Sequence, residues 1–349
     1  AYVMDAARTL TARALDLGEK PSVVSAIVKY ALTERARSVI NDALDVHGGK
    51  GICMGPSNYL SSAYMQMPIA ITVEGANILT RSMIIFGQGV IRGHPYVLAE
   101  IDAALSTDEA NALGTFDRAF FSHCAFFAGN IMRALWHRVT QGRFIRAPGT
   151  GWLKRYRQRV SHLAVAFASI TDVALLSLGG SLKKSERLSG RLADVLMELY
   201  LACAIIKRFE DDGARVEDEP LARWGLEDTL GRAAAALSAF LNNHPTRGLG
   251  LLVSFLVPSV SRGGNPGRSG GGDDGLSHDV ARLMLTQSSV RDRLTHGVFI
   301  SPDVTADAVA VLEAALSAVI ASESAEVAVH AARKSGALME ADTLETAVN

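Results

Sequence analysis

The residue best suited to acid–base chemistry is Glu74, a glutamate that follows a short and mostly apolar stretch of the chain. Residues 69–73 read Ile-Ala-Ile-Thr-Val, and Gly75 comes directly after the carboxylate. Apolar surroundings partly desolvate a carboxylate, which favours its use as a general base near neutral pH. A glutamate in a first helical turn also complements the helix dipole, and this structural interpretation is the commoner one for such a residue.

A short glycine-rich motif precedes this glutamate. Gly48, Gly49 and Gly51 directly follow an amphipathic segment, and Gly49 lies 25 residues before Glu74. Because glycine has no Cβ, consecutive glycines let a second backbone or a phosphate approach the chain closely. A double glycine after a helix is usually only a stop signal, so the motif permits an anion site without establishing one.

Metal, disulfide and nucleophilic chemistry find no support in the residue spacing. His123, His137 and His162 fall in one region without an HExxH or short paired spacing, so we expect no metal site. The three cysteines are odd in number and far apart, which excludes a disulfide framework or a CxxC site and suits a reducing cytoplasm. No serine lies in a GxSxG turn, so nucleophilic hydrolysis is not indicated.

The elements that position these residues are predicted to be helices packed on helices. The 349 residues are 48% hydrophobic but only 6% aromatic, and β-branched residues do not gather into strand-like runs. We therefore predict an all-α fold. Apolar residues at helical intervals predict a helix from Pro21 to Gly48 and another from near Glu74 to Gly87, with a loop from Gly48 to Ala70 between them.

A domain boundary is predicted after residue 92, where the helical pattern resets. Residues 1–92 would form a first helical domain and residues 93–349 a long helical extension. Residues 261–275 contain seven glycines in fifteen positions and are expected to form a flexible loop or linker. The helices expected in the extension are Gly114–Val139, Tyr156–Leu178, Ser189–Asp211, Trp224–Asn242, His278–Leu285 and Ala306–Ser335.

The net charge and the hydropathy of the chain limit the partners that we expect. The net charge of −1 makes a nucleic-acid partner unexpected. No uncharged apolar run is long enough to span a bilayer, and the nearest, Val160–Leu182, contains Asp172 and reads as a buried helical hairpin. Residues 118–171 hold nine Lys or Arg and no acidic residue, which fits a solvated or subunit-facing surface, an anionic membrane surface or the phosphates of coenzyme A.

The window from Val46 to Arg81 resembles the acyl-CoA dehydrogenase family. In that family a helix closes on a Gly-Gly-x-Gly motif and, after a loop, a Glu-Gly motif opens the next helix. Residues beyond 95, including the stretch 207–213, resemble the helical extension of bacterial FadE-type fatty acyl-CoA dehydrogenases. The positions that match the two motifs are Gly48, Gly49, Gly51, Glu74 and Gly75, and Arg81 falls at the family's arginine seven residues after the glutamate.

The resemblance implies an oxidoreductase that uses FAD. Glu74 would take the α-proton of a medium- or long-chain fatty acyl-CoA while the β-hydrogen leaves as hydride to the flavin, giving a trans-2-enoyl-CoA in fatty-acid β-oxidation. Its backbone N–H would help to bind the thioester oxygen. By the same carry-over, Gly75 and Arg81 would contact the substrate, and the cofactor contacts would be Gly48, Gly49, Gly51, Gly75 and Ala76.

The resemblance also implies partners and a setting. It implies a homo-oligomer, in which the glycine motif lines the FAD of a neighbouring subunit, and an electron-transfer flavoprotein as electron acceptor. The enzyme would be cytoplasmic and peripheral on the inner membrane if the basic region binds lipid. The chain opens without an initiator Met inside a helix, so we expect a carboxyl-terminal piece of a longer protein that is inactive alone.

The sequence departs from the family at two places, and two other functions stay open. The usual Arg-Asp pair before the glutamate is absent, with Ser61-Ser62-Ala63 in its neighbourhood, and Ala76 stands where many members have Thr. These departures affect the expected cofactor contacts more than catalysis. The alternatives are a non-catalytic helical assembly or membrane-docking module, and a related acyl-CoA oxidase that passes electrons to oxygen.

Overall fold

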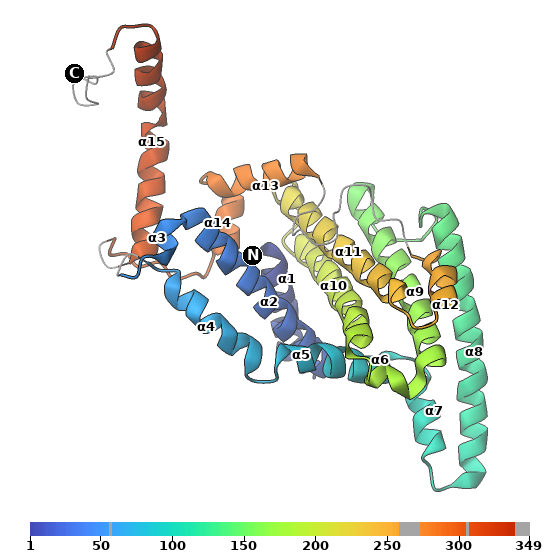
Figure 1. Ribbon diagram of the computed structural model, residues 1–349. Helices are drawn as coiled ribbons and strands as arrows, with labels where there is room; N and C mark the ends of the chain where they lie inside the picture. The colour runs from blue at the N-terminus through green and yellow to red at the C-terminus, as the bar shows by residue number, and fades with distance from the viewer. Residues whose placement is uncertain (56–57, 258–272, 305–306, 339–349) are drawn as a thin grey trace. The chain divides into compact units, whose positions relative to one another are not determined.

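The computed structural model describes residues 1–55, 58–257, 273–304 and 307–338 (Figure 1). All regular structure in these residues is helical, which confirms the predicted all-α fold. The α-helices are α1 (Tyr2–Asp16), α2 (Ser22–His47), α3 (Gly49–Ile52), α4 (Ser61–Thr72), α5 (Asn77–Leu79), α6 (Gly89–Gly93), α7 (Val97–Ala104), α8 (Glu109–Thr140), α9 (Gly151–Leu178), α10 (Glu186–Asp211), α11 (Glu219–Asn242), α12 (Arg247–Ser254), α13 (Asp274–Leu285), α14 (Ser289–Thr295) and α15 (Ala308–Lys334). The π-helix η1 (Thr80–Gln88) joins α5 to α6, and two 3-10 turns, η2 (Gly179–Lys183) and η3 (Val216–Asp218), precede α10 and α11.

The helices fall into two compact units. The first unit contains the described residues of 1–39 and 66–286, and the second contains those of 40–65 and 287–349. The division differs from the predicted boundary after residue 92, because it cuts through α2 and α4 rather than between elements. The domain boundary therefore stays a prediction about the sequence.

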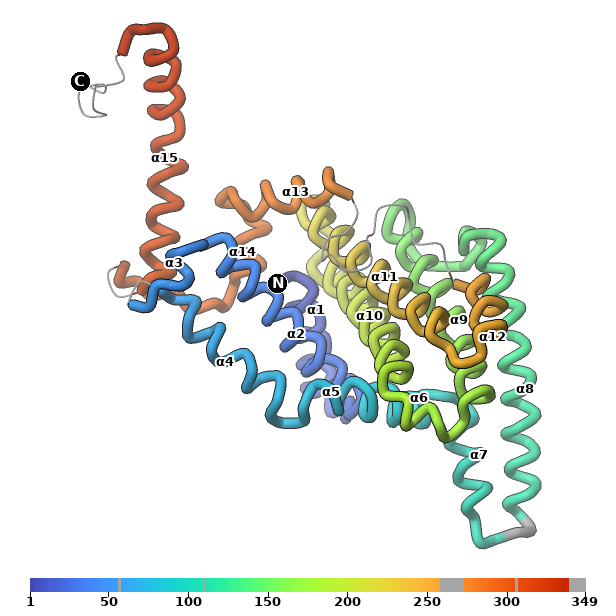
Figure 2. Tube along the Cα trace, viewed as in Figure 1, coloured from blue at the N-terminus to red at the C-terminus, as the bar shows by residue number. Residues whose placement is uncertain are grey.

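The core of the first unit is built around α10 and α11, which pack along each other, with α1, α9 and η1 against α10. Gly225 of α11 allows this close approach, since a Cβ there would lie 3.0 Å from Val3 and 3.1 Å from Ile205. Figure 2 shows the second layer, in which α8 and α9 run side by side as a helical pair. The largest fully buried apolar side chains are Ile85, Ile170, Leu192, Leu201, Ile205, Leu226, Leu237 and Phe240.

The predicted loop from Gly48 to Ala70 is wrong over much of its length. Helix α4 occupies Ser61–Thr72 even though it contains Pro68. A proline inside a helix removes one backbone hydrogen bond but does not forbid the helix. The hydroxyl of Thr72 donates to the carbonyl of Pro68 at 2.6 Å, within the last turn.

The predicted helix from Glu74 to Gly87 has different ends and a different form. It begins at Asn77 and continues without a stop through η1 and α6 to Gly93. The helix continues through Gly89. The missing Cβ of this residue makes room for neighbouring helices, since a Cβ there would lie 3.3 Å from Val23 and 3.5 Å from Leu196. Gly89 therefore serves close approach and not termination.

The predicted helices of the extension correspond to α8, α9, α10, α11, α13 and α15. The hairpin expected at Val160–Leu182 is wrong, because α9 runs unbroken to Leu178. Residues 261–272 of the predicted glycine-rich loop lie outside the described residues, and Asp274 and Gly275 belong to α13.

The second unit contains the end of α2, α3, the start of α4, α14 and α15. A hydrogen bond joins His47 to Tyr59, and the side-chain amide of Asn58 donates to the carbonyl of Gly51 at 2.8 Å. Arg291 of α14 pairs with Glu313 of α15. These polar contacts are local to the unit.

Among the described residues, two helices are long and apolar enough to cross a membrane by length and composition alone, and the bent pair Ser61–Thr72 and Asn77–Gly93 would be a third if it formed one span. The two helices are Gly151–Lys183, with a mean hydropathy of 1.8, and α15, with 1.5. Gly151–Lys183 was not predicted as a span, because Asp172 interrupts its apolar run. In that helix 44% of the apolar window is buried in the first unit, whereas only 6% of the α15 window is buried.

Candidate functional site

Glu74 lies in the sharp turn between α4 and α5. Its φ is 54° and that of Gly75 is 88°, so two successive residues take the left-handed backbone conformation. This conformation is strained for a glutamate and easy for a glycine. The turn bends the chain by 46° between α4 and the helical segment Asn77–Gly93, and it leaves the Glu74 side chain exposed. The predicted desolvation is therefore not provided by the described residues of this chain.

A polar network anchors the turn to α2 within the first unit. The ammonium of Lys29 donates to the carbonyl of Gly75 at 2.7 Å and to Oδ1 of Asn77 at 2.6 Å. The side-chain amide of Asn77 donates in turn to Thr33 at 2.9 Å and to Glu34 at 2.8 Å. Asn77 is buried, so all of its polar atoms that form these bonds are shielded from water. The network fixes the position of the residue next to Glu74.

The apolar side chains on either side of this turn are exposed to solvent. Ile69 and Val73 precede the glutamate, and Ile78, Leu79 and Met83 follow it, all of them at least 46% exposed. Exposed apolar groups close in sequence to one carboxylate leave apolar surface that a ligand or another chain can cover. The site is therefore open on the side that carries the candidate base.

Arg81 projects from η1 toward α10. Its guanidinium donates to both carboxylate oxygens of Asp194, at 2.7 Å and 2.5 Å. The hydrogen bond to Asp194 raises the pKa of Arg81, so this side chain stays charged. Gly190 makes room for it, because a Cβ at Gly190 would lie 3.0 Å from the guanidinium carbon. In the described chain Arg81 joins η1 to α10, and its substrate contact stays a prediction.

The glycine motif lies in the second unit. Gly48 has a φ of 54° and, like Gly49, is exposed with open space where a Cβ would stand. Gly51 differs from them, because it is buried and a Cβ there would lie 3.1 Å from the side chain of Leu44. Its N–H donates to Gly48 and its carbonyl accepts from Asn58. Gly48 and Gly49 thus leave open space beside their backbone, although the N–H of Gly48 already donates to the carbonyl of Leu44 at 2.9 Å, whereas Gly51 closes the turn.

A buried charge cluster lies between α2, α10 and α11 in the first unit. Arg35 donates to Glu198 at 2.8 Å and to Asp228 at 2.8 Å. Burial raises the pKa of Glu198 to about 7, and the charge of Arg35 opposes that rise. The cluster joins three helices and gives the core a titratable group near neutral pH.

Several basic residues of the region 118–171 are paired inside the first unit. Arg157 pairs with Glu210 at 2.5 Å, and Arg159 pairs with Glu227. The region 118–171 contains no acidic residue, but these two arginines find acidic partners in α10 and α11. Arg143, Arg146 and Lys154 are exposed.

Comparison with models of known families shows to which family the chain belongs. A family model described as the bacterial-type C-terminal region of acyl-CoA dehydrogenases matches residues 91–349, and one described as the acyl-CoA dehydrogenase C-terminal domain matches residues 1–87. The chain belongs to the acyl-CoA dehydrogenase family. No solved structure matches it.

Membership in the acyl-CoA dehydrogenase family confirms the resemblance to that family, and the FadE type stays a prediction. Membership assigns acyl-CoA dehydrogenation, an oxidoreductase reaction of fatty-acid metabolism, and the family is generally FAD-dependent. The roles of Glu74, Gly75, Ala76 and Arg81 stay predictions, as do those of the three motif glycines.

Sequence reasoning missed the residues that hold the candidate base in place. Lys29 and Asn77 are 48 positions apart, and neither belongs to the two motifs. The one signal for Asn77 is its place in the first turn after Glu74-Gly75, where an asparagine often binds backbone or neighbouring side chains. Lys29 and Thr33 lie one helical turn apart on α2, which places both on the same face.

Proposed function

We propose that this chain carries the catalytic base of an FAD-dependent fatty acyl-CoA dehydrogenase, and that Glu74 is that base. The observation that supports the proposal is the exposed carboxylate of Glu74 on a left-handed turn that Lys29 and Asn77 hold rigidly. A positioned carboxylate is an effective general base, and the rigid backbone beside it supplies the positioning. The flanking exposed apolar side chains fit an apolar acyl chain laid against the turn.

Two features of the described chain fit a dinucleotide cofactor. Gly48 and Gly49 expose their backbone without a Cβ in the way, which allows a phosphate group to approach closely. Gly75 and Ala76 continue the turn beside Glu74, and Ala76 offers a methyl group where many relatives have a hydroxyl. Gly48 and Gly49 would contact the FAD of a neighbouring subunit, and Gly51 would support them through the turn that it closes. Gly75 and Ala76 would separately contact FAD beside Glu74 in the first unit.

In this mechanism the carboxylate of Glu74 accepts the proton from the α-carbon of the acyl thioester. The bound flavin supplies the acceptor for the hydride that leaves the β-carbon. The N–H of Glu74 donates to none of the described residues, so it is free to bind the thioester oxygen as negative charge develops there. Lys29 donates to the carbonyl of Gly75 and thereby holds the backbone next to this N–H and to the carboxylate of Glu74.

The finer assignments belong to the same proposal. We propose a FadE-type enzyme of fatty-acid β-oxidation that acts on medium- or long-chain substrates, forms a homo-oligomer and passes electrons to an electron-transfer flavoprotein. The exposed apolar side chains around Glu74 support a further covering surface, from substrate or from another part of the protein. An acyl-CoA oxidase is the runner-up, and it would form hydrogen peroxide when the reduced enzyme meets oxygen.

The test is a comparison of Glu74→Gln with wild type in the full-length protein. Flavin reduction by palmitoyl-CoA is followed anaerobically through the loss of flavin absorbance. We expect the variant to retain flavin and to lose at least about 100-fold in the rate of reduction, because a general base contributes roughly that much or more. Glu19→Gln, an exposed glutamate in the turn after α1, is the matched control and should reduce at the wild-type rate.

Equal rates in Glu74→Gln and wild type would show that another residue takes the proton. A wild-type protein that binds no flavin under any condition would favour the helical scaffold instead. Mixing the reduced enzyme with oxygen separates the dehydrogenase from the oxidase, since only the oxidase forms peroxide at the rate of turnover.

A second proposal concerns attachment to an anionic membrane surface. Trp136 and Phe144 are 57% and 74% exposed, with ring centroids 6.1 Å apart, at the end of α8 and in the loop after it. The exposed basic residues Arg143, Arg146 and Lys154 lie in the same stretch of the chain. Exposed aromatic rings beside exposed cations suit the boundary between lipid headgroups and acyl chains.

Vesicle sedimentation tests this attachment. We expect the full-length protein to bind vesicles that contain phosphatidylserine and to bind neutral vesicles less. Each basic residue contributes on the order of 1 kcal/mol, so Arg143→Glu combined with Arg146→Glu should weaken binding at least about 10-fold. Arg215→Glu, at an exposed arginine before η3, should bind like wild type, and equal binding to neutral vesicles would contradict the proposal.

A further inference from the structure

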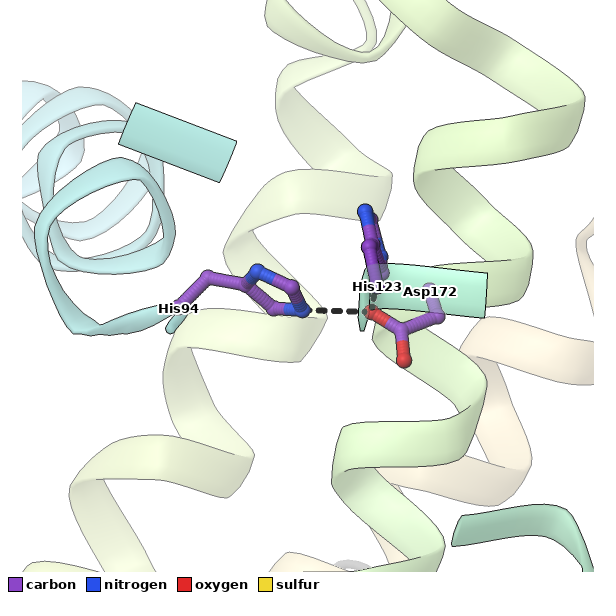
Figure 3. Close-up of side chains that lie close together, drawn as sticks. All are labelled: His94, His123 and Asp172. Carbon is purple, nitrogen blue, oxygen red and sulfur yellow. Dashed lines mark ion pairs between the residues drawn. The ribbon is translucent and has the colours of Figure 1, made fainter. Parts of the chain in front are cut away.

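Three potential metal ligands meet where α6, α8 and α9 come together. His94 is the residue after α6, His123 lies in α8 and Asp172 lies in α9, and Figure 3 shows the three side chains converging. One ligand atom from each lies within 4.8 Å of the other two. Oδ1 of Asp172 is 3.0 Å from Nε2 of His94 and 3.6 Å from Nε2 of His123.

These separations suit a single ion. Ligand atoms about 2.0 to 2.2 Å from a tetrahedral Zn²⁺ lie roughly 3.3 to 3.5 Å from one another. The two distances to Asp172 bracket that range, so small side-chain rotations would centre an ion between the three residues.

Asp172 is a buried carboxylate without the hydrogen bonds that usually accompany one. Its side chain is 1% exposed, and in the described part of the chain neither of its oxygens has a well-aligned hydrogen-bond partner. Nε2 of His94, although close to Oδ1, is likewise without one. A buried charge is stable only when it is paired, hydrogen-bonded or bound to a metal. In the described residues Asp172 has only the two histidines beside it, and a cation at the point where the three groups meet would bind all three.

Glu100 of α7 contacts the ring nitrogen of His123 that faces away from Asp172. Its carboxylate lies 2.8 Å from Nδ1 of His123. A carboxylate in this position holds the ring proton on Nδ1 and leaves the lone pair of Nε2 directed toward Asp172. Tyr96 stacks on the His123 ring at 6.1 Å, and Phe126 meets the His94 ring edge-on at 5.6 Å, which restricts both rings. His123 is therefore oriented as a metal-binding histidine is.

His94 must change its tautomer to bind an ion. Its Nδ1 accepts from the backbone N–H groups of Tyr96 and Val97, both at 3.2 Å, which places the ring proton on Nε2. Binding through Nε2 moves that proton to Nδ1 and releases the two N–H groups. They belong to the start of α7, where backbone N–H groups have no partner within the helix and water can replace the lost acceptor. His123 and Asp172 thus form the prepared pair, and His94 joins by rearrangement.

We propose that His94, His123 and Asp172 form a site for a divalent transition-metal ion, with Zn²⁺ as the best match and water as the fourth ligand. Two imidazoles and one carboxylate are ligands that Zn²⁺ takes, whereas Mg²⁺ and Ca²⁺ require more oxygen atoms than the site offers. The ion joins the corner between α6 and α7 to the α8–α9 pair. This inference revises the expectation of no metal site, and it does not depend on the role of Glu74.

The test uses the full-length protein after treatment with a chelator. Zn²⁺ is titrated against a chromophoric chelator for wild type, His123→Gln, Glu100→Gln and His137→Gln. His137→Gln is the matched control, because it alters another partly buried histidine of α8 that has no neighbouring carboxylate partner among the described residues. We expect one site in wild type and in the control, a weakening of roughly 10- to 100-fold in Glu100→Gln, and loss of the site in His123→Gln.

A spectroscopic measurement on wild type keeps the test independent of variant folding. Co²⁺ added to the metal-free protein should give the intense visible bands of tetrahedral coordination, and Zn²⁺ should displace them. The proposal is overturned if wild type binds no Zn²⁺, if His123→Gln binds it as tightly as wild type, or if Co²⁺ shows only the weak bands of octahedral coordination.

Discussion

Replacing Asn77 with alanine should separate the candidate base from its support. The change removes one charged hydrogen bond from Lys29, one to the carboxylate of Glu34 and one to the hydroxyl of Thr33. Charged hydrogen bonds contribute about 1.5 to 3 kcal/mol each and neutral ones about 1 kcal/mol. Lys29 and Glu34 are only partly buried, so water recovers much of that sum and a loss of about 2 to 3 kcal/mol in the free energy of unfolding is expected.

The effect on catalysis should exceed the effect on binding. Lys29 keeps its bond to the carbonyl of Gly75, so the turn persists but loses its second anchor. A displacement of a reacting group by about 1 Å lowers a rate by up to about 100-fold. Single-turnover flavin reduction in the full-length protein should therefore slow at least about 10-fold, with little change in the substrate concentration that gives half the maximal rate.

The control for this variant is Asn111→Ala. Asn111 is an exposed asparagine at the start of α8, and its side chain bonds to the nearby Asp108 and to no other side chain that the structure describes. It should melt and turn over like wild type to within experimental error. The reasoning would be refuted if Asn77→Ala melted at a lower temperature but reduced its flavin at the wild-type rate, since the network would then stabilise the fold without positioning Glu74.

Three further outcomes follow from the geometry. Glu74→Gly should abolish activity yet leave the free energy of unfolding unchanged or raised by up to about 1 kcal/mol, because glycine relieves the left-handed φ of 54°; a clearly less stable variant in chemical denaturation contradicts this. Burial raises the pKa of Glu198 from 4.5 to about 7, so its stabilising contribution is full below pH 4.5 and is lost as the pH rises through 7. Glu198→Gln should therefore gain in melting temperature relative to wild type between pH 5 and pH 8, and a constant difference would disprove the assignment. Gly225→Ala should destabilise the protein by about 1 to 3 kcal/mol through contacts with Val3 and Ile205, whereas Gly231→Ala on the same helix, where a Cβ meets open space, should stabilise it by up to about 1 kcal/mol in the same denaturation assay.

Much of the helical framework could be predicted because long amphipathic helices carry their own periodicity. Helices α8 to α11 were all expected from apolar residues at three- and four-residue intervals. Helix α4 was not, because the two prolines of the stretch Gly48–Ala70 were interpreted as loop signals, although tertiary context decides whether one proline ends a helix. The same limit applied at Gly89, whose packing role depends on α2 and α10.

The candidate site was predictable only where chemistry and spacing coincide in one short window. A carboxylate after an apolar run is common, and Glu74 and Gly75 stood out only because their spacing from Gly48, Gly49 and Gly51 resembles the motifs of the family. Lys29 and Asn77 did not, because a lysine on a helix and an asparagine in a turn are ordinary until the fold brings them within 2.6 Å. Asp172 likewise looked like an interruption of an apolar run, and only the packing of α9 brings it to two histidines.

The π-helix η1 has a consequence for comparing this chain with its relatives. A π-helical stretch is an α-helix that has taken up an extra residue, and the surrounding helix continues in place on either side. Relatives one residue shorter between Thr80 and Gln88 would keep an ordinary α-helix there and preserve both ends, from Asn77 to Gly93. A single-residue gap in an alignment at this segment would therefore record a change of helix type, with the turn at Glu74 and the corner at His94 left where they are.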